Sequence, residues 1–162
     1  DRLDRAKLLV ERDLQVDVNG SPDTAINAAR LAEKCPELRI VINHCGNLLI
    51  DGKEPARAWR EGVAAAAKHP HVFCKVSALV EQTAEKPAPR TLDYYRPTLD
   101  HLWNCFGEER LVFGSNWPVS DRGAPFETVV ALVRDYFNEK GTRAAERYFF
   151  ENSKSAYAWP KR

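Results

Sequence analysis

Long apolar runs and an excess of one charge are both missing from this 162-residue sequence. Its longest uninterrupted apolar stretches are only a handful of residues, too short for a membrane span, and the opening DRLDRAK has no apolar core like that of a signal peptide. Lysine and arginine total 24 against 23 aspartate and glutamate, so the net charge of +1 provides no field to attract nucleic acid or an anionic membrane. We therefore expect neither a nucleic acid nor a membrane as partner.

Cysteine pairs and glycine-rich phosphate loops are also absent. The cysteines, Cys35, Cys45, Cys74 and Cys105, form no C-x-x-C pair, which argues against a zinc knuckle or a redox motif. We interpret them as buried free thiols in a reducing compartment and expect a cytoplasmic protein. No expected strand is followed by G-x-G-x-x-G or G-x-x-x-x-G-K, so the usual nucleotide-phosphate turns are not indicated.

The hydrophobic residues, 44% of the total, suffice for one domain with a core and alternate between strand and helix patterns. Apolar and polar residues alternate in DLQVDVNG (13–20), whereas LRIVIN (38–43) is a continuous apolar run typical of a strand buried on both faces. Ser21 is expected to cap the helix between them, with Pro22 at its first position. Further strands are expected in VFCKV (72–76) and LVFGS (111–115), further helices from near Pro55, around 99–106, from about Pro125 and in the tail TRAAERYFFENSKSAYAW, and a long irregular loop at 77–91.

Four strands that alternate with helices indicate a parallel sheet, because each helix provides the crossover that a parallel return requires. Two architectures are compatible with this order. A closed eight-stranded barrel usually takes about 250 residues, so the chain would be roughly its second half. A doubly wound open sheet needs no further strands, but it commonly carries a glycine-rich phosphate turn after an early strand, and that turn is missing. Neither a linker nor a second domain is indicated.

Four motifs, in order, resemble one enzyme family. VINHCGN comes from the second expected strand and the turn after it, VFCKVSAL covers the third, RLVFGSNWPVS covers the fourth, and FFENSKSAY lies near the end. Together they resemble the amidohydrolase-related barrel hydrolases, in particular the branch of sugar lactonases and 2-pyrone-4,6-dicarboxylate hydrolase. The resemblance implies an α/β fold in which residues 1–162 form a single domain, the C-terminal half (strands five to eight) of a (β/α)8 TIM barrel, without its N-terminal half.

The resemblance also implies an activity and partners. It implies a hydrolase that attacks a small-molecule lactone or related C–O ester with an activated water at the carboxyl-end mouth of the barrel. Because half a barrel leaves two sheet edges unpaired, we expect the chain to associate with a second copy or with the missing half.

Two departures from the family's pattern affect the expected chemistry. The paired H-x-H of the family's first strand is absent along with the first half, and Asn116 stands where the family usually has the aspartate of S-D-W-P. An amide cannot take a proton at neutral pH, so Asn116 would orient a water through its carbonyl oxygen, and Asp121 in the same loop could supply a carboxylate. The alternative function is a non-catalytic small-molecule-binding barrel that has lost its base.

His44 directly follows an apolar strand, at the rim where barrel enzymes keep their chemistry. A neutral imidazole there can bind zinc or polarise a substrate carbonyl; the alternative is a rim histidine hydrogen-bonded to a loop. The resemblance favours the functional interpretation, with a divalent metal (zinc) as candidate cofactor, but members of the branch differ in needing one, and a catalytic zinc normally has three protein ligands. Structural roles are expected for His69 and His71, beside the entry to the third strand, whereas His101 on a helix is expected to be a solvated or packed surface histidine.

Lys75 lies among apolar neighbours in VFCKV, where an ammonium group is costly unless it faces a polar cavity or a carboxylate. We expect it to hold a substrate carboxylate or to stabilise the oxyanion formed on hydrolysis; the alternative is a structural ion pair with a buried aspartate such as Asp17. The catalytic candidates are thus His44, Lys75 and Asn116, and the candidate substrate contacts are Asp17, Trp117, Asp121 and Arg122.

Overall fold

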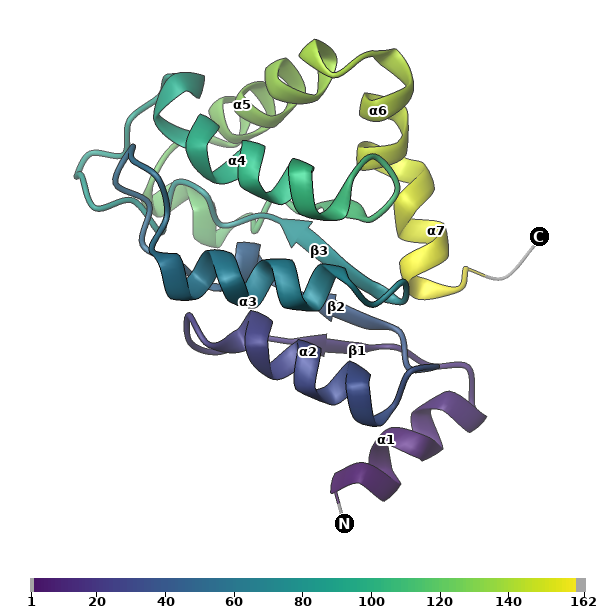
Figure 1. Cartoon of the computed structure of the whole chain (residues 1–162). Coiled ribbons are helices and arrows are strands. Elements are labelled where there is room, and N and C mark those ends of the chain that lie inside the picture. Colours follow the sequence, from purple (N-terminus) through teal and green to yellow (C-terminus); the bar gives the residue numbers. More distant parts are fainter. Residues whose placement is uncertain (1, 160–162) are drawn as a thin grey trace.

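The computed structural model describes residues 2–159 and contains a four-stranded parallel sheet (Figure 1). Neighbouring strands pair in chain order, β1-β2-β3-β4. The predicted alternation of parallel strands with helices is confirmed, and the third strand has the predicted bounds. The strands are β1 (Val16–Val18), β2 (Ile40–Ile42), β3 (Val72–Val76) and β4 (Leu111–Phe113).

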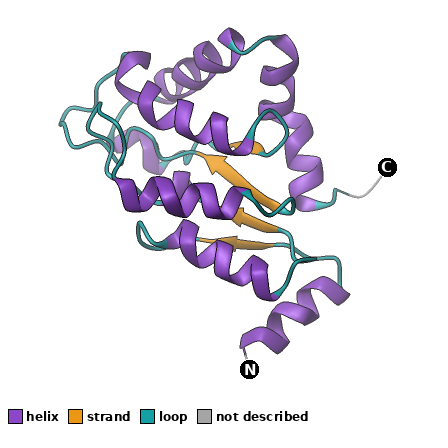
Figure 2. Ribbon diagram, viewed as in Figure 1, coloured by secondary structure: helices purple, strands orange, loops and turns teal. Residues whose placement is uncertain are grey.

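Helices connect and flank the strands (Figure 2). The expectation that Ser21 caps the first connecting helix is wrong: that helix begins at Thr24, and Ser21 belongs to the preceding turn, in which its carbonyl accepts a hydrogen bond from the Thr24 amide at 2.9 Å. Within the described part of the chain, no helix is both long and apolar enough to cross a membrane. The helices are α1 (Arg2–Glu11), α2 (Thr24–Lys34), α3 (Arg57–Ala67), α4 (Leu92–Phe106), α5 (Phe126–Glu139), α6 (Thr142–Glu146), the π-helical turn η3 (Arg147–Glu151) and α7 (Asn152–Tyr157).

The two faces of the sheet are covered differently. The apolar stripes of α2, α3, α4 and α5 form the main core against one face, which presents residues such as Ile40, Cys74 and Leu111. The opposite face presents a smaller cluster of Val41, Phe73 and Val112, and α7 packs onto it. Because successive strand residues point to opposite faces, Asp17 and Lys75 belong to this second face: Asp17 lies opposite Val41, and Lys75 lies opposite Val112.

The carboxyl ends of the strands all lie on one side of the molecule. Since the strands are parallel, all their carboxyl ends lie at the same edge, beside the long loops between β2 and α3 and between β3 and α4 (Figure 1). The order does not reverse among the described strands, whereas a doubly wound sheet reverses at its switch point. The sequential order therefore favours a barrel-like arrangement over the doubly wound alternative.

Candidate functional site

Sharp turns follow three of the strands at their carboxyl ends. His44 after β2, Ala78 after β3 and Asn116 after β4 all have left-handed backbone conformations, with φ of 52°, 56° and 57°. This region costs a non-glycine residue about 1–2 kcal/mol. Such strain persists only where the surroundings hold it, and it gathers at binding and catalytic sites.

His44 is held in place from the loop that follows β3. Its Nδ1 atom lies 2.8 Å from the hydroxyl oxygen of Ser77, a residue that is only 2% exposed. The side-chain amide of Gln82 donates to the His44 carbonyl oxygen at 3.1 Å. Among the described residues, the other ring nitrogen, Nε2, makes no hydrogen bond. The imidazole is therefore oriented through one nitrogen, which leaves the other able to bind a ligand.

The pKa of the His44 imidazole is lowered, which favours the neutral ring. Burial lowers the pKa of His44, and the positive charge of Lys75 lowers it further, while the carboxylate of Glu81 partly offsets both effects. A neutral ring at pH 7 can accept a proton or polarise a carbonyl, depending on its tautomer.

Asn116 contacts an acidic residue that sequence reasoning missed. Its side-chain amide nitrogen donates to Oε1 of Glu81 at 2.6 Å, across the gap between the loops that follow β3 and β4. The other carboxylate oxygen, Oε2, is buried and accepts no hydrogen bond from the described residues. We call the group of His44, Ser77, Glu81 and Asn116 the strand-end site.

Lys75 and Asp17 are brought together on the second face of the sheet. Lys75 Nζ lies 2.9 Å from Asp17 Oδ2, and the Tyr157 hydroxyl donates to the same oxygen at 3.1 Å. Burial disfavours the charged form of Lys75, but the contacts with Tyr157 and Asp17 outweigh burial and raise its pKa. The ammonium group therefore stays charged, and the ion pair weighed as the alternative role for Lys75 is present.

The remaining candidates lie on the outer side of the loop after β4. The indole nitrogen of Trp117 donates to Asp121 Oδ2 at 3.2 Å, and the Trp117 side chain is 60% exposed. Arg122 is exposed, in the short 3-10 helix η2 (Val119–Arg122). The side chains of Trp117, Asp121 and Arg122 take no part in the His44–Ser77 and Asn116–Glu81 hydrogen bonds.

The other histidines have structural contacts. The His69 carbonyl accepts from Arg110 at 2.9 Å, and the His71 carbonyl accepts from the Ile40 amide at 3.0 Å, both at the end of the sheet where strands begin. The ring of His101 packs on Trp59, with ring centroids 5.4 Å apart. His69 and His71 thus contribute backbone contacts at this end of the sheet, and the ring of His101 is packed, which is one of the two environments expected for it.

The side chains near His44 provide few ligands for a metal ion. In the described segment, no group of three or more histidine, cysteine, aspartate and glutamate side chains is placed to hold an ion. Burial raises the pKa of the Cys45 thiol, next to His44, to about 12, so this sulfur stays protonated. The described residues alone therefore do not fit a catalytic zinc, which normally takes three protein ligands.

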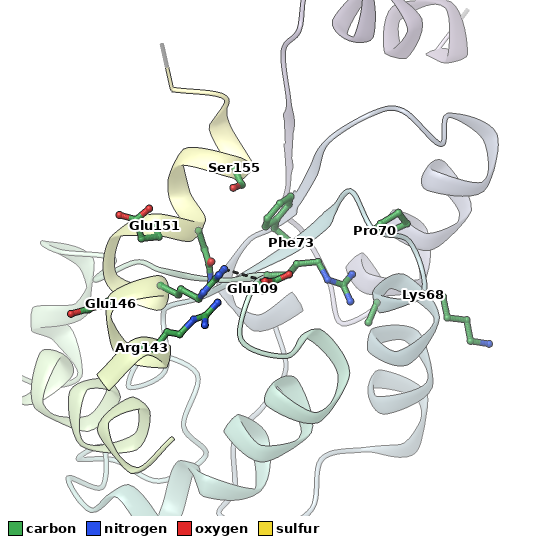
Figure 3. Close-up of a pocket in the computed structure, with 12 residues that line it drawn as sticks. Lys68, Pro70, Phe73, Glu109, Arg143, Glu146, Glu151 and Ser155 are labelled. Carbon is green, nitrogen blue, oxygen red and sulfur yellow. Dashed lines mark ion pairs between the residues drawn. The ribbon is translucent and has the colours of Figure 1, made fainter. Parts of the chain in front are cut away.

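A large cavity lies away from the strand-end site. It has a volume of about 850 Å³ and is lined by charged residues of the helical tail together with Phe73 and residues near the start of β3 (Figure 3). Among the charged residues that line it, Arg147 pairs with Glu109 at 3.3 Å. None of the candidate site residues lines it.

Known proteins resemble the chain in sequence and in structure. The amidohydrolase family model matches residues 4–158. L-fucono-1,5-lactonases from Burkholderia multivorans and Burkholderia ambifaria are 35% and 34% identical over 67% and 69% of this chain, which corresponds to 38% and 37% of their own lengths.

Solved structures show the same fold. A crystal structure of a Burkholderia multivorans amidohydrolase with bound zinc has a TM-score of 0.88 and 25% identity, and the match covers 98% of this chain and 57% of that one. Amidohydrolase 2 from Bifidobacterium longum subsp. infantis has a TM-score of 0.76 and 22% identity, over 98% of this chain and 55% of that one. The chain thus spans less than two thirds of the length of these relatives. Because the family model covers nearly all of its residues, the chain belongs to the amidohydrolase family.

Proposed function

We propose that the protein carrying this chain hydrolyses a small-molecule lactone or a related C–O ester at the strand-end site. The observation that carries the proposal is the convergence of an oriented, neutral imidazole (His44) and an amide–carboxylate pair (Asn116 and Glu81) at the carboxyl edge of the sheet. Barrel enzymes keep their chemistry at this edge. The two L-fucono-1,5-lactonase relatives support a lactone as the substrate class.

Each candidate residue has a proposed task. His44 polarises the substrate carbonyl, Asn116 helps to place the attacking water through its carbonyl oxygen, and Lys75 stabilises the oxyanion that forms. Asp17 contacts the substrate beside Lys75. Trp117, Asp121 and Arg122 remain proposed substrate contacts from the rim of the mouth.

The proposed architecture is the C-terminal half, strands five to eight, of a (β/α)8 barrel with the chain as one domain. The sequential strand order and the solved relatives, of which the chain matches somewhat more than half, support it. The chain would then join its missing half or a second copy through the unpaired edges of β1 and β4. Light scattering of residues 1–162 tests this: we expect associated species, and a compact monomer that binds no apolar dye would contradict it.

A metal and a location complete the proposal. As the alternative to polarising the carbonyl through the same nitrogen, we propose His44 as this chain's contribution to a zinc site whose other ligands come from outside the described residues, since a related amidohydrolase was crystallised with zinc. Bound there, the ion would act as a Lewis acid. Three buried free cysteines, Cys35, Cys45 and Cys74, support the proposed cytoplasmic location.

A substrate panel tests the proposed activity. The complete protein that carries this chain should hydrolyse one or more members of a set of sugar 1,5-lactones, beginning with L-fucono-1,5-lactone, measured by acid release with and without added zinc. Tight binding of a lactone without turnover would contradict hydrolysis and favour the non-catalytic binding barrel. The comparisons give that alternative no support.

A further inference from the structure

Glu81 is the acid that lies against Asn116. In the family's S-D-W-P pattern the residue at position 116 would itself be acidic, and here it is an amide. The amide nitrogen can only donate, and it donates to Glu81 Oε1 at 2.6 Å. A carboxylate is therefore present at this point of the mouth, but it is supplied by the loop after β3.

The backbone around Glu81 is fixed from several sides. The Ile50 amide donates to the Gln82 carbonyl at 2.8 Å, and Ile50 pairs with Thr83 in an isolated bridge between two loops. The Lys86 ammonium group donates to the Glu81 carbonyl at 3.2 Å. With Gln82 also bonded to the His44 carbonyl, the carboxylate is anchored between the ends of β2 and β4.

One oxygen of the Glu81 carboxylate is free to accept a proton. An ionised carboxylate accepts several hydrogen bonds through its two oxygens. Oε1 is engaged by Asn116, whereas Oε2 is shielded from solvent and accepts nothing from the described residues. A buried polar atom without a partner is unusual in a folded protein and is consistent with a functional role.

We propose that Glu81 is the general base of the hydrolysis and that Asn116 holds it in position; this role rests on the proposed lactone hydrolysis. Glu81 Oε2 takes a proton from a water as the water oxygen bonds to the lactone carbonyl carbon, and the carbonyl electron pair moves to oxygen. When the carbonyl re-forms, the ring C–O bond breaks, and the leaving oxygen takes the proton back from Glu81. Lactone and water thus give the open-chain hydroxy acid, with Glu81 regenerated.

Charge explains why an amide suits position 116. Two carboxylates this close cannot both ionise easily, so one would hold a proton. Asn116 removes that conflict and adds a hydrogen bond to the ionised base. Asn116→Asp alone should therefore slow hydrolysis at neutral pH rather than improve it.

The experiment exchanges the two groups in the complete protein. Glu81→Gln should lower kcat on L-fucono-1,5-lactone, or on the panel lactone turned over fastest, by about 10²-fold to 10⁴-fold with little change in KM. The exchange variant Glu81→Gln with Asn116→Asp restores one carboxylate and one amide in contact, and its kcat should recover at least about tenfold. Glu85→Gln, the same change at an exposed position of the same loop, is the matched control and should retain the wild-type rate.

The outcomes separate this role from the proposed function. An active wild type with an equally active Glu81→Gln variant overturns the role of Glu81 and leaves lactone hydrolysis standing. A loss in Glu81→Gln that the exchange variant does not relieve assigns Glu81 a structural role and also overturns the proposal. A wild type without turnover on any lactone overturns the proposed function and this role with it.

Discussion

At the residue scale, Lys75 has two interpretations that activity measurements can separate. It forms a 2.9 Å ion pair with Asp17, and both side chains are mostly shielded, at 22% and 30% exposure. If Lys75 also stabilises the oxyanion, its charge is needed in the transition state as well as in the folded protein.

Replacing each partner alone tests this. Lys75→Met should lower kcat by about 10²-fold to 10³-fold, as loss of an oxyanion donor does. Asp17→Asn, which leaves the ammonium group in place, should act mainly on KM. Steady-state kinetics on the complete protein measures both. Equal effects of the two substitutions on kcat would mean that Lys75 acts only as the partner of Asp17.

At the element scale, the end of β4 packs closely against the end of β3. A Cβ atom added at Gly114 would lie 2.9 Å from the Ser77 Cβ atom and 3.0 Å from the Lys75 side chain. Ser77 is the residue that orients His44. The absence of a side chain at Gly114 therefore lets β4 approach two parts of the site at once.

Gly114→Ala should disturb both stability and activity. Overpacking of this kind costs about 1–3 kcal/mol, and displacement of Ser77 should lower kcat as well. Thermal melting and lactone turnover measure the two effects. Ser155→Ala, at an exposed position of α7, is the control and should change both only slightly. A Gly114→Ala variant with unchanged stability and turnover would show that Ser77 and Lys75 leave room for a side chain at position 114.

The same elements show what the sequence could and could not predict. β3 has its predicted bounds because VFCKV is a short apolar run between a proline-containing turn and a loop. His44 could be placed at the strand end because it directly follows such a run. Glu81 could not, because loop residues follow no periodicity, and its approach to Asn116 depends on bonds between loops that are distant in sequence. The only available signal was an acidic residue in the longest loop.

The tail illustrates a second limit. Its apolar spacing predicts one helix, and the backbone does remain helical from α6 to α7. The π-helical turn η3 interrupts it where Tyr148 stacks on Phe137 at 3.6 Å between ring centroids and donates to the Val76 carbonyl. Tertiary contacts of this kind are not encoded in local propensity.

At the scale of the whole molecule, two histidines make stability depend on pH. Burial lowers the pKa of His44 and of His101 below their ordinary value near 6.5. As the pH falls through that value, the unfolded chain binds protons that the folded chain does not, so the free energy of unfolding decreases. The stability that depends on neutral His44 and His101 is fully present above their pKa in the unfolded chain and declines below it.

Urea unfolding of the complete protein at about pH 7.5 and about pH 5.5 measures this dependence. We expect a lower midpoint at the acidic pH. His101→Gln keeps a side-chain N–H near the Arg60 carbonyl but cannot titrate. This variant should therefore show a smaller difference between its urea midpoints at the two pH values. An identical difference in the variant would exclude His101 as a source of the acid sensitivity.

The most direct test of the whole account compares two histidines at opposite ends of the sheet in the complete protein. His44→Ala should lower kcat/KM for a lactone by at least about 100-fold, with a melting temperature within about 3 °C of the wild type. His71→Ala, at the end where strands begin, should leave both turnover and melting temperature unchanged. Intact turnover in His44→Ala, or equal losses of stability and activity in both variants, would contradict a catalytic site at the carboxyl ends of the strands.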